Sequence, residues 1–151
     1  MRLVRTYRGP NTTINSVKPD VNILRLSATL LVISDDKVLT DLALRIVKPP
    51  WKLVRQDADR FMSDRILAEP NVRLVVLDDQ GVDENDRGWL LVQIRKRFSD
   101  ASLLYIAGSQ SDGNERLARR NGAHYYASKP LSPERFARVL ESFLRTQQVK
   151  G

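Results

Sequence analysis

The stretch VRLVVLDD, residues 72–79, decides the fold. It is a short apolar run, β-branched in part, that ends in the two carboxylates Asp78 and Asp79. A run of this length bounded by acids is typical of a buried central strand of a parallel sheet. Because ligands of open parallel sheets bind at the carboxyl ends of strands, Asp78 is the first candidate functional residue.

Strand-like and helix-like segments alternate along the rest of the chain. Strands are expected at 28–33 (ATLLVI), 51–55, 101–107 and 124–127, in addition to the strand that ends at Asp78. Apolar residues recur at helical spacing in 39–46, 58–66, 89–98 and 133–144, and a short further helix is expected to run to about Arg120. Five alternations predict an α/β fold, a doubly wound five-stranded parallel sheet with helices on both faces.

Local signals give the helix ends. The segment 112–115 (DGNE) resembles a capping box, which places a helix start at Asp112. Ser132 is expected to cap the last helix, with Pro133 at its first position. His124, the one histidine of the chain, has no neighbour at metal-ligand spacing, so it is interpreted as a surface residue.

Length and composition indicate a single domain. The 151 residues contain no cysteine and carry a net charge of +7. No apolar stretch approaches the roughly 18–20 residues that span a bilayer, and no signal peptide is recognisable, so a cytoplasmic location without a membrane partner is expected. The expected division is a basic N-terminal arm (1–27), a body (28–146) and a C-terminal tail or linker (147–151).

Chemically capable side chains follow three of the expected strands. These are Asp35 and Asp36 after the first strand, Asp78 after the third and Lys129 after the fifth. Such strand ends converge at one edge of a doubly wound sheet. Carboxylates with a backbone carbonyl suit Mg²⁺, and a carboxylate beside the metal can attack phosphorus, with a lysine to pair with the phosphate.

The body resembles the receiver domain of two-component response regulators, from about Thr29 to Arg145. The resemblance rests on LLVISDD (30–36), RLVVLDD (73–79) and, most specifically, GAHYYASKP (122–130). It implies the flavodoxin-like strand order 2-1-3-4-5. It also implies Asp78 as the phospho-acceptor and Lys129 as the phosphate partner.

The same resemblance assigns the remaining site residues. It implies Mg²⁺ as a possible cofactor, bound by Asp35, Asp78 and the backbone carbonyl of Gln80. Tyr126 matches the aromatic residue that changes rotamer on activation. The Lys129-Pro130 peptide is expected to be cis, as in the family.

The chain departs from the family pattern at several positions. Ser34 takes the first of the two acidic places and Asp35 the second; Asp36 could substitute only if the loop slips by one residue. Ala107 stands where the family has a phosphate-binding hydroxyl, a switch position coupled to Tyr126. Asp79 adds a negative charge beside the acceptor, which would disfavour a phosphate if it points inward. A weakened Mg²⁺ site is the expected result.

Three functions remain open, and none of them is that of an enzyme in its own right. The favoured one is an atypical receiver that signals through protein contacts, with weak or no phosphorylation at Asp78. The second is a phospho-accepting receiver that a histidine kinase phosphorylates. A homodimer through the helix 4–strand 5–helix 5 face (112–120, 124–127 and 133–144) fits either. The third is nucleic-acid contact, through the basic arm or through an output domain outside this chain.

Overall fold

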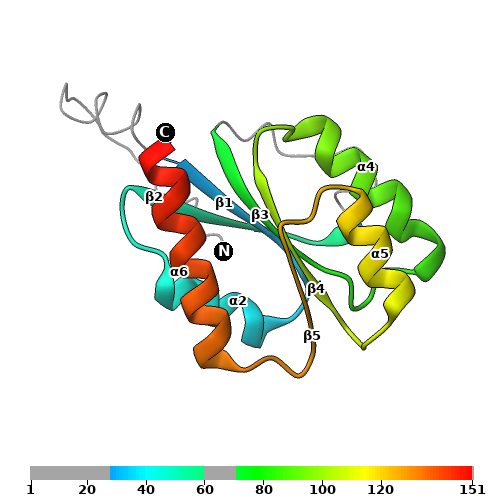
Figure 1. Cartoon of the computed structure of the whole chain (residues 1–151). Helices are drawn as coiled ribbons and strands as arrows, with labels where there is room; N and C mark the ends of the chain where they lie inside the picture. The colour runs from blue at the N-terminus through cyan, green and yellow to red at the C-terminus, as the bar shows by residue number, and fades with distance from the viewer. Residues whose placement is uncertain (1–27, 60–70, 151) are drawn as a thin grey trace.

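A computed structural model describes residues 28–59 and 71–150, with side chains as far as 147. The described residues form a five-stranded parallel sheet in the order β2-β1-β3-β4-β5 (Figure 1). The strands are β1 (Ala28–Ile33), β2 (Trp51–Gln56), β3 (Val72–Asp78), β4 (Ser102–Ala107) and β5 (Tyr125–Ser128). The predicted fold class and the predicted strand order 2-1-3-4-5 are confirmed.

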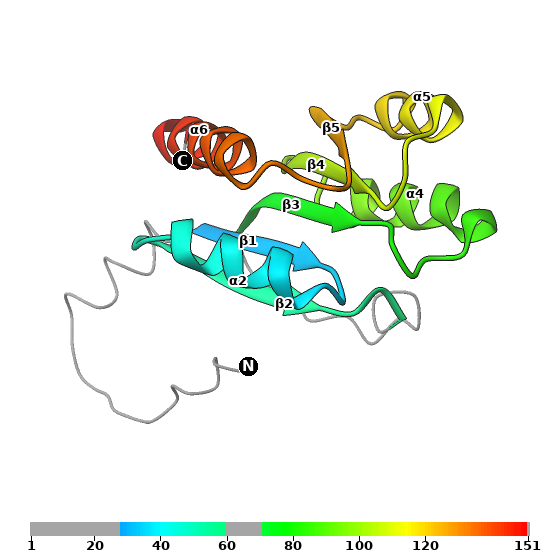
Figure 2. The ribbon, with the colours of Figure 1, turned by 90° about the horizontal axis from the view of Figure 1, so that it is seen from below.

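Helices cover both faces of the sheet (Figure 2). α2 (Lys37–Ile46) and α6 (Pro133–Lys150) lie on one face. α4 (Arg87–Arg97), which follows the 3-10 turn η3 (Glu84–Asp86), lies with α5 (Asp112–Arg120) on the other. The sheet therefore separates two apolar cores, one under each pair of helices.

The central strands are apolar on both sides because both of their faces are covered. Leu74, Val76 and Leu104 pack towards α2 and α6, whereas Val75 and Leu77 pack towards α4. These side chains have no exposed surface. Burying each one stabilises the fold by about 1.5–3 kcal/mol relative to exposure. Because both faces of this strand are covered, its sequence does not alternate between apolar and polar residues.

One helix cap and one helix end differ from the sequence prediction. α5 covers the predicted residues 112–120, but its N-cap is Ser111, whose hydroxyl accepts a hydrogen bond from the Asn114 N–H, and not Asp112 as the capping box implies. α6 continues to Lys150, so residues 147–150, expected to form a tail or linker, extend the helix. The Gln147 amide anchors that last turn by a hydrogen bond to the Ser102 hydroxyl. The Ser132 cap is confirmed, since its hydroxyl accepts from the Arg135 N–H.

Two predicted segments lie outside the described residues, the basic arm 1–27 and most of the helix expected at 58–66. In the part of the chain that is described, no helix combines the length and the hydropathy needed to cross a membrane. His124 is exposed, as expected, and its Nδ1 accepts a hydrogen bond from the Leu103 N–H.

Candidate functional site

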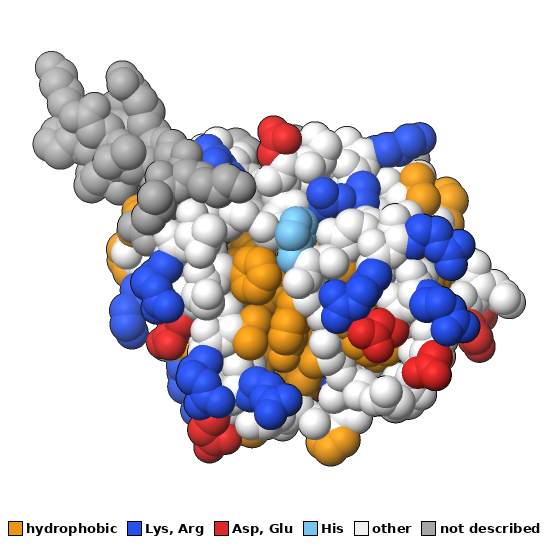
Figure 3. Space-filling model, viewed as in Figure 1, with side chains coloured by type: hydrophobic (Ala, Val, Ile, Leu, Met, Phe, Trp, Pro, Cys, Tyr) orange, Lys and Arg blue, Asp and Glu red, His pale blue; other side chains and the backbone are white. Residues whose placement is uncertain are grey.

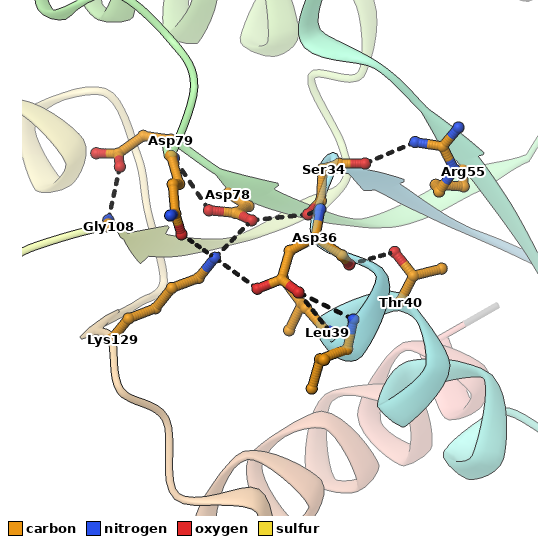
Figure 4. A network of polar contacts seen from close by, with 11 residues as sticks. Ser34, Asp36, Leu39, Thr40, Arg55, Asp78, Asp79, Gly108 and Lys129 are labelled. Carbon is orange, nitrogen blue, oxygen red and sulfur yellow. Dashed lines mark hydrogen bonds and ion pairs between the residues drawn. The ribbon is translucent and has the colours of Figure 1, made fainter.

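Three loops meet at the carboxyl edge of the sheet and bring together side chains that are far apart in the sequence. The Lys129 ammonium, just after β5, lies 2.9 Å from Asp78 Oδ2 at the end of β3. It also lies 2.8 Å from Asp36 Oδ2 in the β1–α2 loop and 2.6 Å from Gln80 Oε1. Figure 4 shows Asp36 and Asp78 converging on the ammonium. The Lys129-Pro130 peptide is cis, as expected from the resemblance.

Asp78 is a buried carboxylate, and both of its oxygens accept hydrogen bonds from the chain. Its residue is 1% exposed. Oδ2 accepts from the Ser34 hydroxyl at 2.7 Å and from Lys129, and Oδ1 accepts from the Gln80 N–H at 3.0 Å. A buried charge is tolerated only when it is paired and hydrogen-bonded, and Asp78 meets that condition without any ligand.

The β1–α2 loop presents Ser34 and Asp36 to this cluster, while Asp35 lies elsewhere. Asp36 is the N-cap of α2 and has an extended backbone; its Oδ1 accepts from the Val38 and Leu39 N–H groups, and its Oδ2 remains for Lys129. The Ser34 hydroxyl accepts from the Asp36 N–H at 2.9 Å. The chain bends at Asp35, whose side chain is exposed, while Ser34 and Asp36 on either side of it contact Asp78 and Lys129. The helix cap thus selects Asp36 as the acid that contacts the lysine.

Charge pairing shifts the pKa values of this pair in opposite directions. The hydrogen bond from Lys129 lowers the pKa of Asp36 below its usual value, with the N–H groups at the helix cap adding to the effect. Burial alone would lower the pKa of Lys129, but the bonds to Asp36 and Asp78 outweigh it, so that the pKa is raised. Both groups therefore stay charged at neutral pH.

Asp35 has a different environment. It is exposed, and its carboxyl lies near Asp57 and Arg55 at the end of β2. Lost hydration and the neighbouring Asp57 carboxyl raise the pKa of Asp35. A Cβ on Gly81 would lie 3.7 Å from Asp35 Oδ2, so the carboxyl approaches the loop that follows Gln80.

The oxygens at this edge have the chemistry that Mg²⁺ prefers, but two of the carboxylates are already paired with a cation of the chain. Asp36 and Asp78 already share the Lys129 ammonium as their cation. Among residues 28–59 and 71–147, no group of three or more His, Cys, Asp or Glu side chains is placed to hold a metal ion. Mg²⁺ would therefore compete with the Lys129 ammonium for these oxygens, and its predicted binding by Asp35, Asp78 and the Gln80 carbonyl stays a proposal.

The two switch positions lie next to the cluster. Ala107, fully buried, ends β4 and offers no hydroxyl. Tyr126 on β5 stacks on Tyr105 of β4, with ring centroids 5.6 Å apart and planes 13° apart. The Tyr126 hydroxyl donates to the Ser111 carbonyl at 3.4 Å, and burial, with Asp79 nearby, raises its pKa.

Asp79 forms a second cluster, which the sequence analysis did not anticipate. Its carboxylate turns away from Lys129 and accepts a hydrogen bond from the Gly108 N–H at 2.7 Å (Figure 4). It also accepts one from the Tyr105 hydroxyl at 2.6 Å. Asp79 was expected to disfavour a phosphate on Asp78 only if its side chain pointed into the pocket. The side chain points away from the pocket, so that condition is not met. The only sequence signal was a second acid after the strand, and its partner Tyr105 lies inside an apolar run.

A cavity of about 460 Å³ opens beside Lys129. Asp36, Gln80 and Gly108 line its polar side, and its apolar side comes from α2 and from the start of α6. The cavity gives solvent and small anions a route to the Lys129 end of the cluster. The cavity does not reach Asp78, which lies behind Lys129 and is only 1% exposed.

Comparisons with known proteins agree with this architecture. No protein-family model matches the chain. It is 25% identical over 126 residues to the transcriptional regulatory protein YvrH of Bacillus subtilis, a match over 82% of this chain and 52% of the relative. The chain thus spans about half the length of that curated relative.

Solved structures of receiver domains are similar in fold. A CheY-like response regulator receiver domain from Methanospirillum hungatei superposes with a TM-score of 0.66 at 20% identity, over 83% of this chain and 99% of its own. The signal receiver domain of an HD-domain-containing protein from Pseudomonas fluorescens gives 0.64 at 21% identity, over 82% and 98%. A response regulator from Thermotoga maritima gives 0.62 at 16% identity, over 79% and 98%. The chain has the receiver fold of response regulators.

Proposed function

We propose that this chain is an atypical receiver domain, which regulates a signalling partner by direct contact with little or no phosphorylation at Asp78. The observation that carries the proposal is that both oxygens of the Asp78 carboxylate already accept hydrogen bonds, from Ser34, Lys129 and the Gln80 amide. One of these oxygens must attack phosphorus if Asp78 is to be phosphorylated. Attack through Oδ2 would break a buried hydrogen bond of 2.7 Å and an ion pair of 2.9 Å, and attack through Oδ1 would compete with the 3.0 Å bond from the Gln80 N–H.

Two further features support this proposal. Ala107 supplies no hydroxyl to a phosphoryl group, and a hydrogen bond to a charged group is worth about 1.5–3 kcal/mol. Ser34 replaces a negative charge of the family pattern with a neutral oxygen, so a divalent cation would be held less strongly. Both changes reduce the stabilisation that a phosphoryl group on Asp78 would receive. Signalling would then depend on contacts at the protein surface.

The contact surface that we propose is the face formed by α5, β5 and α6, the structural counterpart of the helix 4–strand 5–helix 5 face. β5 is an edge strand of the sheet. Tyr125, Ala127, Val139 and Phe143 are partly buried apolar residues on this face. Figure 3 shows an apolar strip there, flanked by Lys and Arg side chains. A histidine kinase, another signalling protein or a second copy of the chain would fit this apolar strip.

The decisive experiment adds acetyl phosphate with Mg²⁺ to the full chain and measures intact mass, with the Asp78→Asn variant as control. The expected result is no phosphoryl group on either protein. In parallel, beryllofluoride with Mg²⁺ is titrated and followed by ¹⁵N NMR. Unchanged signals at Asp78 and Gln80 at millimolar ligand support the proposal, whereas one phosphoryl group per chain, absent from Asp78→Asn, would overturn it.

The alternative is a phospho-accepting receiver that requires Mg²⁺. What favours it is the position of Lys129, which is 2.9 Å from Asp78 and borders a cavity open to solvent. It predicts that Ser34→Asp, which restores a second acid, tightens Mg²⁺ binding to Asp78 in an NMR titration. If Ser34→Asp neither binds Mg²⁺ more tightly nor takes up phosphoryl groups, the alternative fails.

A further inference from the structure

The Asp79 carboxylate has no role in the function proposed above, yet it is as buried as Asp78. Its residue is 1% exposed. Besides the short bonds from Tyr105 and Gly108, its Oδ2 lies 3.5 Å from Asn114 Nδ2 and 3.6 Å from Arg87 Nε. Burying a carboxylate this fully costs several kcal/mol unless its partners repay the lost hydration. So costly a group in so organised a setting calls for a functional explanation.

The described partners of Asp79 come from four different segments. Tyr105 belongs to β4, Gly108 to the β4–α5 loop, Arg87 is the first residue of α4, and Asn114 lies in the first turn of α5. One carboxylate therefore fixes the end of β3 against β4, α4 and α5. Burial and the bond to Asp79 raise the pKa of Tyr105 well above its usual value, so the phenol remains a donor.

A chain of contacts leads from Asp79 to the proposed contact surface. The Tyr105 ring that holds the carboxylate stacks on Tyr126 of β5. The Tyr126 hydroxyl in turn reaches the carbonyl of Ser111, the N-cap of α5. The position of Tyr126 and of the start of α5 thus depends on groups that Asp79 holds.

Gly108 joins this network to the cavity. Its backbone lines the cavity that Lys129 and Gln80 also line. Its N–H already donates to Asp79 Oδ1 at 2.7 Å, so an anion entering the cavity would not find that donor available. A Cβ on Gly108 would lie 3.2 Å from Gln80 Cβ, which shows how closely the two loops approach.

We propose that Asp79 is a positioning residue, an internal anion that holds the β4–α5 loop and the Tyr105–Tyr126 pair in one arrangement whatever the state of Asp78. This proposal rests on the proposed function, since it concerns the regulation of the same surface. The carboxylate takes the backbone donor that an external anion would need. The face formed by α5, β5 and α6 is therefore kept in its binding form, without a phosphoryl group.

The test replaces the charge and keeps the shape, in the Asp79→Asn variant of the full chain. The Gly108 amide proton is expected to lose its charge-assisted hydrogen bond, move upfield and exchange with solvent at least about tenfold faster. The ring signals of Tyr126 are expected to shift as well. The Asp41→Asn variant makes the same chemical change at an exposed carboxylate of α2 and should leave all these signals unchanged. Unaltered Gly108 exchange and Tyr126 signals in Asp79→Asn would overturn the proposal.

The Tyr105→Phe variant provides a second test with a smaller perturbation. It keeps the stacked ring and removes only the hydroxyl that binds Asp79. The same signals are expected to move in the same direction by a smaller amount. If Asp79→Asn does not fold, Tyr105→Phe decides alone: Gly108 exchange within about twofold of the parent chain rejects the proposal.

Beryllofluoride with Mg²⁺ separates this proposal from the proposed function. If the parent chain binds it, the function proposal fails, but the Asp79 proposal still predicts shifts confined to Asp78 and Gln80, with Tyr126 and α5 unmoved. In Asp79→Asn the shifts should extend to Tyr126 and α5. If Tyr126 already responds in the parent chain, the Asp79 proposal is wrong. A purely structural role would lower stability in Asp79→Asn without creating this ligand response.

Discussion

Replacement of Lys129 by Met tests whether the ammonium is what makes a buried Asp78 tolerable. Met keeps most of the side-chain volume and removes the charge. Breaking a buried ion pair by removing one partner costs about 3–5 kcal/mol. Asp78 keeps two donors, the Ser34 hydroxyl and the Gln80 amide, and the Lys129 side chain is 14% exposed, so water can replace part of the lost pairing. We therefore expect Lys129→Met to lower the free energy of unfolding by about 2–3 kcal/mol, which lies at or below the lower end of this range.

That loss is a large share of the 5–15 kcal/mol that typically stabilises a domain. It is measured by urea unfolding at pH 7, followed by circular dichroism, with the urea midpoint expected to fall and the slope to stay constant. The Asp78→Asn change in the Lys129→Met background removes the unpaired charge. The double variant should then recover part of the loss, and the double-mutant cycle should give a coupling of about 1–3 kcal/mol.

Lys37→Met is the matched control, because Lys37 is 87% exposed and makes only a 3.8 Å surface pair with Asp41. It should change the free energy of unfolding by less than about 0.5 kcal/mol. The reasoning is refuted if Lys129→Met is no more destabilising than Lys37→Met. A coupling near zero between Lys129 and Asp78 would refute it equally.

Three further predictions concern the β1–α2 loop. Ser34→Ala removes a donor 2.7 Å from Asp78 Oδ2, so the free energy of unfolding should fall by about 1–3 kcal/mol in the same urea assay; no change would contradict the importance of that bond. The raised pKa of Asp35 means that the fold disfavours its charged form beside Asp57, so Asp35→Asn should raise the free energy of unfolding at pH 7 by less than about 1 kcal/mol. This gain should vanish at pH 3, where the Asp35 carboxyl is protonated in the parent chain. The pKa of Asp36 is lowered, so its contribution is complete above its ordinary value of 3.8 and is lost as the pH falls through the folded-state pKa. Thermal melts should accordingly show a steeper acid loss below pH 4 in the parent chain than in Asp36→Asn; parallel curves would contradict the pairing.

The fold was predictable from the sequence because the burial of a strand or helix determines which of its residues are apolar. A central strand covered on both faces is apolar at nearly every position, and 72–77 and 28–33 show this, with Arg73 and Thr29 as the exceptions. The strand order and the cis Lys129-Pro130 peptide followed from the resemblance carried by GAHYYASKP. The convergence of Asp78 and Lys129 followed from the topology, since carboxyl ends of parallel strands share one edge.

Which side chains touch at that edge was decided only by the tertiary structure. The choice of Asp36 over Asp35 depends on where α2 begins, and boundaries of this kind shift by a residue or two from any local pattern. Its contact with Lys129 joins residues 93 apart in the sequence, and the Tyr105–Asp79 bond joins residues 26 apart. Asp79 is an acid after a strand and Tyr105 an aromatic residue within a strand, which are common positions for both residue types. Their roles depend on which neighbours lie within hydrogen-bond distance. Sequence periodicity determines which face of an element is buried; only packing determines which polar atom meets which, because a shift of one residue or one rotamer changes the partner.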